Sequence, residues 1–179
     1  MEGPNHEIDW SLVDEEVHLH INRRLATMSA FLNGRVNYEL MASVWPTADT
    51  DPDSSPATVE FAHIWQAMPQ IVYSRTLTEA GPNTTIVRDV VADEVRALKA
   101  QPGGDMVIGG ATLAASFLAL DLVDELALYL QPVVLGRGRP LFPTADIRRH
   151  LELIETRTFT NGVINLRYRL TDRPPAPAS

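Results

Sequence analysis

The chain has 179 residues, a formal net charge of −8 at pH 7 and no cysteine. This length suits one domain with a sizeable core. The negative charge argues against a nucleic-acid partner, and the absence of cysteine excludes disulfides, thiolate metal sites and cysteine nucleophiles. The polar N-terminus lacks the apolar segment of a secretion signal, and charged residues interrupt the most apolar region, 106–135. We therefore expect a cytoplasmic protein with no membrane partner.

The first predicted element is a helix over 11–28. Ser11 can cap it, and the acidic run Asp14–Glu16 places negative charge in its first turn. Apolar residues then recur every four positions, at Val13, Val17, Ile21 and Leu25. This spacing is typical of the buried face of an amphipathic helix.

The chain up to residue 74 then alternates between short strands and helices. An apolar run predicts a strand over 30–33, and helical spacing predicts a helix over 37–44. The proline-rich segment 46–56 is predicted to be a loop. A second amphipathic helix over 57–68 and a strand over 70–74 follow it.

The same alternation continues to residue 135. It predicts a strand over 84–88, a helix over 92–100, a strand over 105–108, a helix over 111–120 and a long strand over 125–135. Alternating strands and helices favour an α/β fold with helices on both faces of a mostly parallel sheet.

The end of the chain has a different pattern. Strands are predicted over 156–160 and 163–170, and Asn161–Gly162 between them is a strong hairpin signal. The proline-rich end, 172–179, is predicted to be a flexible tail. The expected organisation is one domain over 1–171 that ends in an antiparallel hairpin.

Three predicted strands end in residues suited to binding a nucleotide. Gly34–Arg35, Ser74–Arg75 and the segment Gly109–Thr112 each follow an apolar run. In open α/β sheets, ligands bind at the carboxyl ends of the strands. We therefore predict a phosphate-binding crevice formed by Gly34, Arg35, Ser74, Arg75, Gly109, Gly110, Ala111 and Thr112.

The chemistry of each motif supports this prediction, although each also has a purely structural interpretation. Paired glycines before a helix let the backbone approach a ligand, and the N–H groups of the helix start attract anions. Arg75 can grip a phosphate with two hydrogen bonds, and an arginine in this position accommodates the 2′-phosphate of NADP. Glycines and serines also form simple turns, and an arginine at a helix end is often only solvated.

Other candidates carry less information. Glu15 and Glu16 could include a general acid, although acidic residues at a helix start usually act as electrostatic caps. The histidines lack metal-ligand spacing, so no metal site is predicted. The segment 136–139 has glycines and arginines, which suit either a turn or an anion site.

The ordered set of motifs resembles the dihydrofolate-reductase-like superfamily. In particular, the chain is similar to stand-alone relatives of the reductase domain of the bifunctional riboflavin-biosynthesis deaminase-reductase. The matching stretches cover nearly the whole chain: 3–10, 34–39, 72–75, 107–113, 132–136 and 138–142.

The resemblance implies a central mixed, mostly parallel sheet, NADPH as hydride donor and a small pyrimidine- or pterin-type substrate. It also implies a homodimer. It assigns Gly34, Arg35, Asn37, Ser74, Arg75 and 109–112 to the cofactor, with Asn37 in place of the family's usual threonine. Glu15 or Glu16 is the nearest match to a catalytic carboxylate.

One departure from the family leaves a second hypothesis open. Family members usually begin with an apolar strand ahead of the segment matched by 3–5, and that strand is absent from this sequence. The first hypothesis is an NADPH-dependent reductase. The alternative is a non-catalytic relative that binds a nucleotide or forms a dimer.

Overall fold

The computed structural model describes residues 9–138, 140–142 and 148–172, which form two compact units. We call residues 18–122 the parallel unit, and residues 1–17 together with 123–179 the antiparallel unit. The predicted tail beyond Asp172, the start of the segment 3–10 and Arg139 lie outside the described residues.

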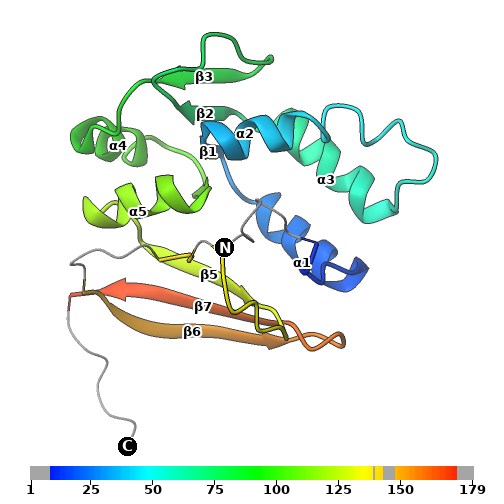
Figure 1. Cartoon of the computed structure of the whole chain (residues 1–179). Coiled ribbons are helices and arrows are strands. Elements are labelled where there is room, and N and C mark those ends of the chain that lie inside the picture. The colour runs from blue at the N-terminus through cyan, green and yellow to red at the C-terminus, as the bar shows by residue number, and fades with distance from the viewer. Residues whose placement is uncertain (1–8, 139, 143–147, 173–179) are drawn as a thin grey trace, which may run out of the picture. The chain divides into compact units, whose positions relative to one another are not determined.

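The parallel unit contains a four-stranded parallel sheet in the order β3-β2-β1-β4 (Figure 1). Its strands are β1 (Ala30–Gly34), β2 (Gln70–Tyr73), β3 (Thr84–Val87) and β4 (Met106–Gly109). The register aligns their carboxyl ends: Asn33 pairs with Gly109, and Gly34 pairs with Tyr73, which also pairs with Val87. All four strands therefore end at the same edge of the sheet.

Four helices connect or flank these strands. They are α2 (Arg35–Ala42), α3 (Pro56–Ala67), α4 (Ala92–Lys99) and α5 (Ala111–Ala119). The core packs Phe31 and Val72 of the sheet against Tyr38 of α2 and against Phe61 and Trp65 of α3. Burial of these apolar side chains, most of them aromatic, stabilises this unit.

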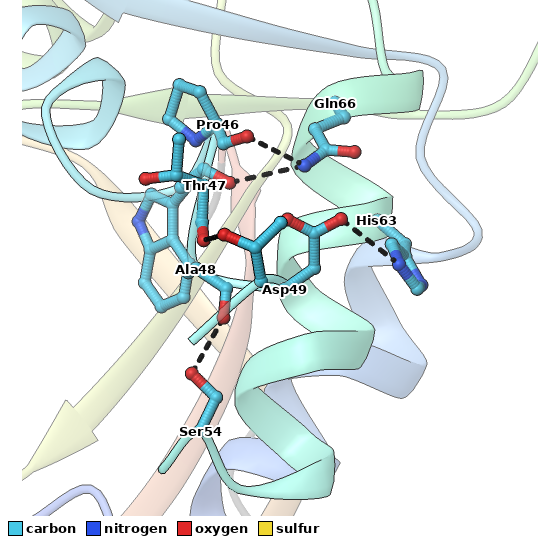
Figure 2. A network of polar contacts seen from close by, with 9 residues as sticks. Pro46, Thr47, Ala48, Asp49, Ser54, His63 and Gln66 are labelled. Carbon is cyan, nitrogen blue, oxygen red and sulfur yellow. Dashed lines mark hydrogen bonds and ion pairs between the residues drawn. The ribbon is translucent and has the colours of Figure 1, made fainter. Parts of the chain in front are cut away.

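The loop before α3 is held to that helix by a polar network (Figure 2). Gln66 donates to the carbonyl oxygen of Pro46 over 3.2 Å, and Ser54 donates to the carbonyl oxygen of Ala48 over 2.7 Å. His63 lies 3.5 Å from an Asp49 carboxylate oxygen. The hydroxyl of Ser55 caps α3 by accepting from Thr58 N–H, so the predicted proline-rich loop is an ordered helix entry.

The antiparallel unit contains a three-stranded sheet in the order β5-β7-β6. Its strands are β5 (Glu125–Leu130), β6 (His150–Thr158) and β7 (Ile164–Thr171). Gly162, with a φ of +86°, lies in the turn of the predicted β6–β7 hairpin. The helix α1 (Glu15–Leu25) begins in this unit and continues in the parallel unit.

The α/β prediction is confirmed, with the refinement that the antiparallel strands form a sheet of their own. Three predicted boundaries are wrong by four residues or more. α1 begins at Glu15, because Asp14 rather than Ser11 caps it by accepting from Val17 N–H over 3.0 Å. β5 ends at Leu130, shortly before Pro132, which cannot donate to a strand ladder. β6 begins at His150, six residues before the predicted start.

Within the described ranges, none of the helices has both the length and the apolar character needed to cross a bilayer.

Candidate functional site

The carboxyl edge of the four-stranded sheet brings the predicted motifs together. Gly34, Ser74 and Gly110 lie at or just beyond the ends of β1, β2 and β4, which are neighbouring strands. With strands about 4.8 Å apart, this edge is about 14 Å wide from β4 to β3. It can therefore accommodate an elongated ligand that lies across several strands.

Two helices begin side by side at the β1–β4 part of this edge. Their N-cap residues are Gly34 for α2 and Gly110 for α5, and neither helix has a side-chain cap hydrogen bond. Gly110 has a φ of +98°, which disfavours other residues, and a Cβ on it would lie 3.9 Å from the backbone nitrogen of Gly34. Two adjacent helix starts without side-chain caps favour an anionic group.

A chain of three carboxamides runs beneath these helix starts. Asn37 donates to Asn33 Oδ1 over 2.8 Å, and Asn33 donates to Gln70 Oε1 over 2.9 Å. Gln70 donates to the carbonyl oxygens of Trp65 and Met68, each over 3.3 Å. Because the NH₂ group of Gln70 donates to two backbone carbonyls, its side-chain oxygen must accept from Asn33, and Asn33 Oδ1 must in turn accept from Asn37. We call these three side chains the amide relay; the donor and acceptor ends of each are fixed. Asn33 and Gln70 are each 2% exposed.

The amide relay explains why residue 109 is glycine. A Cβ there would lie 2.3 Å from Asn33 Oδ1 and 2.5 Å from Asn37 Nδ2. No side chain fits at these distances without displacing the amides. The groups that approach Gly109 closely are the side chains of Asn33 and Asn37, and the predicted approach of its backbone to a cofactor stays a prediction.

Ser74 forms the turn that follows β2. It is 7% exposed, and its hydroxyl oxygen accepts from the N–H groups of Thr76 over 3.2 Å and Leu77 over 2.9 Å. Arg88 supports the same turn by donating to the carbonyl oxygens of Ser74 and Leu77. These contacts shape the loop that presents Arg75.

Arg75 extends from this turn and is paired with Asp89. Its Nε donates to Asp89 Oδ1 over 2.7 Å, and its Nη2 contacts the same oxygen. The side chains are 81% and 51% exposed, respectively. Exposed pairs of this kind are weak, so the guanidinium remains available to a phosphate.

The other predicted cofactor residues lie at the two helix starts. Arg35 donates to Glu39 over 2.7 Å along α2, with both side chains nearly half exposed. Ala111 and Thr112 form the first turn of α5, where Thr112 is exposed. A shallow depression also lies beside α2, but its lining, which includes Tyr38, Glu39, Leu77 and Glu79, contains none of the predicted site residues.

Glu15 and Glu16 belong to the antiparallel unit. The Glu16 carboxylate accepts from the backbone and hydroxyl of Thr160, over 3.2 and 2.9 Å, and from Arg157 over 3.2 Å. The Thr160 hydrogen bonds, together with Arg157, lower the pKa of Glu16. These contacts favour a structural role for Glu16, and its assignment as a proton donor stays a prediction, as does that of Glu15, which is exposed.

Sequence reasoning missed three residues that form or support this edge. Asn33 and Gln70 are polar residues within apolar strand sequences, and a buried polar residue needs a partner. That mismatch was a usable signal for the amide relay. Asp89 lies two residues beyond β3, where its partner Arg75 could be inferred only from the β2–β3 register.

Comparison with known proteins decides the family. A model of the RibD C-terminal domain matches residues 1–165. The chain belongs to the RibD C-terminal domain family. It is also 35% identical over 169 residues to YyaP of Bacillus subtilis (strain 168), described as uncharacterized, with coverage of 94% of this chain and 87% of that protein.

Two solved structures share the fold of this chain. A putative riboflavin biosynthesis protein from Shewanella sp. PV-4 has a TM-score of 0.69 at 21% identity, covering 95% of this chain and 91% of the other. A Thermotoga maritima diaminohydroxyphosphoribosylaminopyrimidine deaminase/5-amino-6-(5-phosphoribosylamino)uracil reductase has a TM-score of 0.61 at 12% identity. That match covers 95% of this chain and 52% of the Thermotoga protein. At these identities the likeness establishes the fold.

Proposed function

We propose that this protein is an NADPH-dependent reductase that transfers a hydride to a pyrimidine- or pterin-type substrate. Membership of the RibD C-terminal domain family supports an oxidoreductase of the riboflavin-pathway type. The observation that carries the cofactor assignment is the aligned edge of the parallel sheet. There, two helix starts without side-chain caps lie at β1 and β4, and the exposed Arg75 lies beyond β2.

The residues of this edge suit the parts of NADPH. The N–H groups at the starts of α2 and α5 would hold the pyrophosphate, because unpaired helix N–H groups attract anions. Arg75 would hold the 2′-phosphate, one to two strand spacings (about 5–10 Å) further along the edge. When bound, NADPH would supply the hydride, and the residues of the chain would hold and orient it.

The amide relay contributes rigidity to this arrangement. It ties Asn37, on the first turn of α2, to β1 and β2 through Asn33 and Gln70. The start of α2 is thereby fixed relative to the strand ends before any ligand binds. A fixed binding surface loses less entropy when a ligand binds than a mobile one.

Titration with NADPH tests the proposal. We expect NADPH to change tryptophan fluorescence and to raise the melting temperature. At an NADPH concentration of one hundred times Kd, binding should add about 2.7 kcal/mol to the free energy of unfolding. Arg75→Ala should weaken NADPH binding, whereas Arg96→Ala should not, because Arg96 is an exposed arginine with an aspartate partner within α4. The absence of any change in fluorescence or melting temperature at millimolar NADPH would contradict the proposal.

A specific observation also supports the alternative, a non-catalytic nucleotide-binding relative. Asn37 and Arg75 already have protein partners in Asn33 and Asp89. Consumption of NADPH, followed by its absorbance with an aminopyrimidine or pterin substrate, separates the two functions. Binding without turnover of any such substrate would favour the alternative. The proposed homodimer is tested by measuring the mass in solution.

A further inference from the structure

The ion pair between Arg75 and Asp89 joins two residues in equivalent places on neighbouring strands. Tyr73 and Val87 are register partners at the ends of β2 and β3, and each charged residue follows two positions later. The Ser74 N–H donates to the carbonyl oxygen of Val87 over 2.8 Å, so the two strand exits are held together. Arg75 and Asp89 therefore share one place at the edge of the sheet.

These two side chains recognise different nucleotides. An arginine at a strand end accommodates the 2′-phosphate of NADP, whereas an acidic residue accepts a hydrogen bond from the free 2′-hydroxyl of NAD. Here both types of residue lie at one site and contact each other. An aspartate beside the arginine also repels a 2′-phosphate and neutralises part of the charge that attracts it.

The surrounding contacts leave this pair free to respond to a ligand. Arg88, the neighbouring cation, is held by two backbone carbonyls in the turn after β2. Arg75 makes its described hydrogen bonds to Asp89, and both side chains are exposed. An exposed pair contributes at most about 1 kcal/mol, so a ligand can displace either partner from the other.

We infer that Asp89 is a specificity-determining residue that restrains the preference for a 2′-phosphorylated cofactor. With Asp89 present, Arg75 is shared between the carboxylate and the phosphate, and Asp89 can accept a hydrogen bond from the ribose of NADH. The protein therefore discriminates only modestly between NADPH and NADH. This inference rests on the proposed function, because it assumes that the adenosine end of the cofactor lies at β2 and β3.

Cofactor titration of Asp89→Asn tests this inference. The substitution keeps the shape of the side chain and removes its charge. We expect NADPH to bind up to about fivefold more tightly to this variant, because Arg75 no longer shares its charge with the carboxylate of a weak exposed pair. NADH should bind equally well or more weakly. The gain for NADPH should shrink at high salt, because exposed charges are screened.

Three further measurements separate the possible outcomes. Asp93→Asn is the matched control, because Asp93 pairs with the exposed Arg96 within α4. This variant should leave the ratio of NADPH affinity to NADH affinity unchanged. Arg75→Ala should lower the ratio of NADPH affinity to NADH affinity below one, because Asp89 alone favours the free 2′-hydroxyl of NADH. Melting temperatures should change little, since the Arg75–Asp89 pair is exposed.

A ratio that does not change in Asp89→Asn, while the wild type binds both cofactors, overturns the inference and leaves the proposed function intact. Failure of the wild type to bind either cofactor overturns the proposed function and with it this inference.

Discussion

The two units of this protein differ in where most of their paired polar side chains lie. In the parallel unit, the buried polar residues are neutral amides and a hydroxyl: Asn22, Asn33, Gln70 and Ser74. The antiparallel unit buries one amide, Asn165, and its sheet also carries partly buried ion pairs: Arg167 pairs across the sheet with Glu125 over 2.7 Å and with Glu155 over 3.3 Å. Arg169 pairs with Glu152 over 3.2 Å in the same sheet.

The difference follows from where these side chains lie. Buried groups in the parallel unit cannot be charged without a large desolvation penalty, so neutral amides and a hydroxyl occupy these positions. The paired side chains of the antiparallel sheet are between about a quarter and a half exposed, and ion pairs in such positions cost little and contribute little. The parallel unit should therefore be sensitive to shape, and the antiparallel unit to pH and salt.

Gly109→Ala should produce the largest effect, because it acts on the tightest packing of the amide relay. The new Cβ would lie 2.3 Å from Asn33 Oδ1 and 2.5 Å from Asn37 Nδ2. Displacing these amides should lower the free energy of unfolding by about 2–4 kcal/mol, measured in urea.

Gly81→Ala is the matched control for that substitution. Its Cβ would lie 3.4 Å from the hydroxyl oxygen of Tyr38, which is an ordinary contact. This variant should be neutral or stabilised by up to about 1 kcal/mol, because alanine restricts the unfolded chain. Equal effects at the two positions would show that the amide relay does not fill the space at Gly109.

The contrast between these glycines also shows how far the sequence could predict the site. Gly109 was identified as a place of close backbone approach because it follows an apolar strand and precedes a helix. The identity of the approaching groups was not predictable from the local pattern, because Asn33 lies beside Gly109 only through the β1–β4 register. The same limit applies to Asp89, whose partner is fourteen positions away on another strand.

The elements themselves followed the local pattern closely in the parallel unit. The predicted strand over 84–88 and the predicted helix over 92–100 differ from β3 and α4 by one residue at one end. Apolar runs there are short and bounded by glycine, proline or polar residues, so the sequence indicates where each strand and helix ends. β5 was predicted too long because Val133 to Leu135 continue its apolar pattern beyond Pro132.

Asn37→Ala should have an intermediate effect, because it removes one donor from the amide relay. Asn33 Oδ1 would lose the 2.8 Å hydrogen bond from Asn37, and the fixed direction of the relay prevents Asn33 from turning. An unsatisfied buried acceptor costs about 1–3 kcal/mol. The better helix propensity of alanine offsets about 0.5 kcal/mol of this.

Chemical denaturation of Asn37→Ala at several pH values tests that effect. The loss should be the same from pH 7 to pH 4, because neither amide titrates in that range. A loss that varied with pH would show that a titrating group, rather than Asn33, is the partner of Asn37.

Glu16→Gln should have the smallest effect on the free energy of unfolding at neutral pH. Unlike the effect of Asn37→Ala, this effect should depend on pH. The folded pKa of Glu16 lies below its usual value of 4.5, because the Thr160 hydrogen bonds and Arg157 stabilise the carboxylate. A lowered folded pKa means that the folded state binds this proton less readily than the unfolded chain, so the contribution to stability is complete above pH 4.5. It is lost as the pH falls through the folded pKa.

The stability difference between wild type and Glu16→Gln should therefore be positive at pH 7 and decline below pH 4.5. Added salt should also reduce it, because the Glu16 and Arg157 side chains are more than a third exposed. Arg157 keeps its position over the Phe159 ring, 5.0 Å from the centroid, so the substitution removes a charge without removing the support of its partner. A stability difference that stayed constant in acid would mean that Glu16 acts through its shape and not through its charge. The proposed pH sensitivity of the antiparallel unit would then not extend to the start of α1.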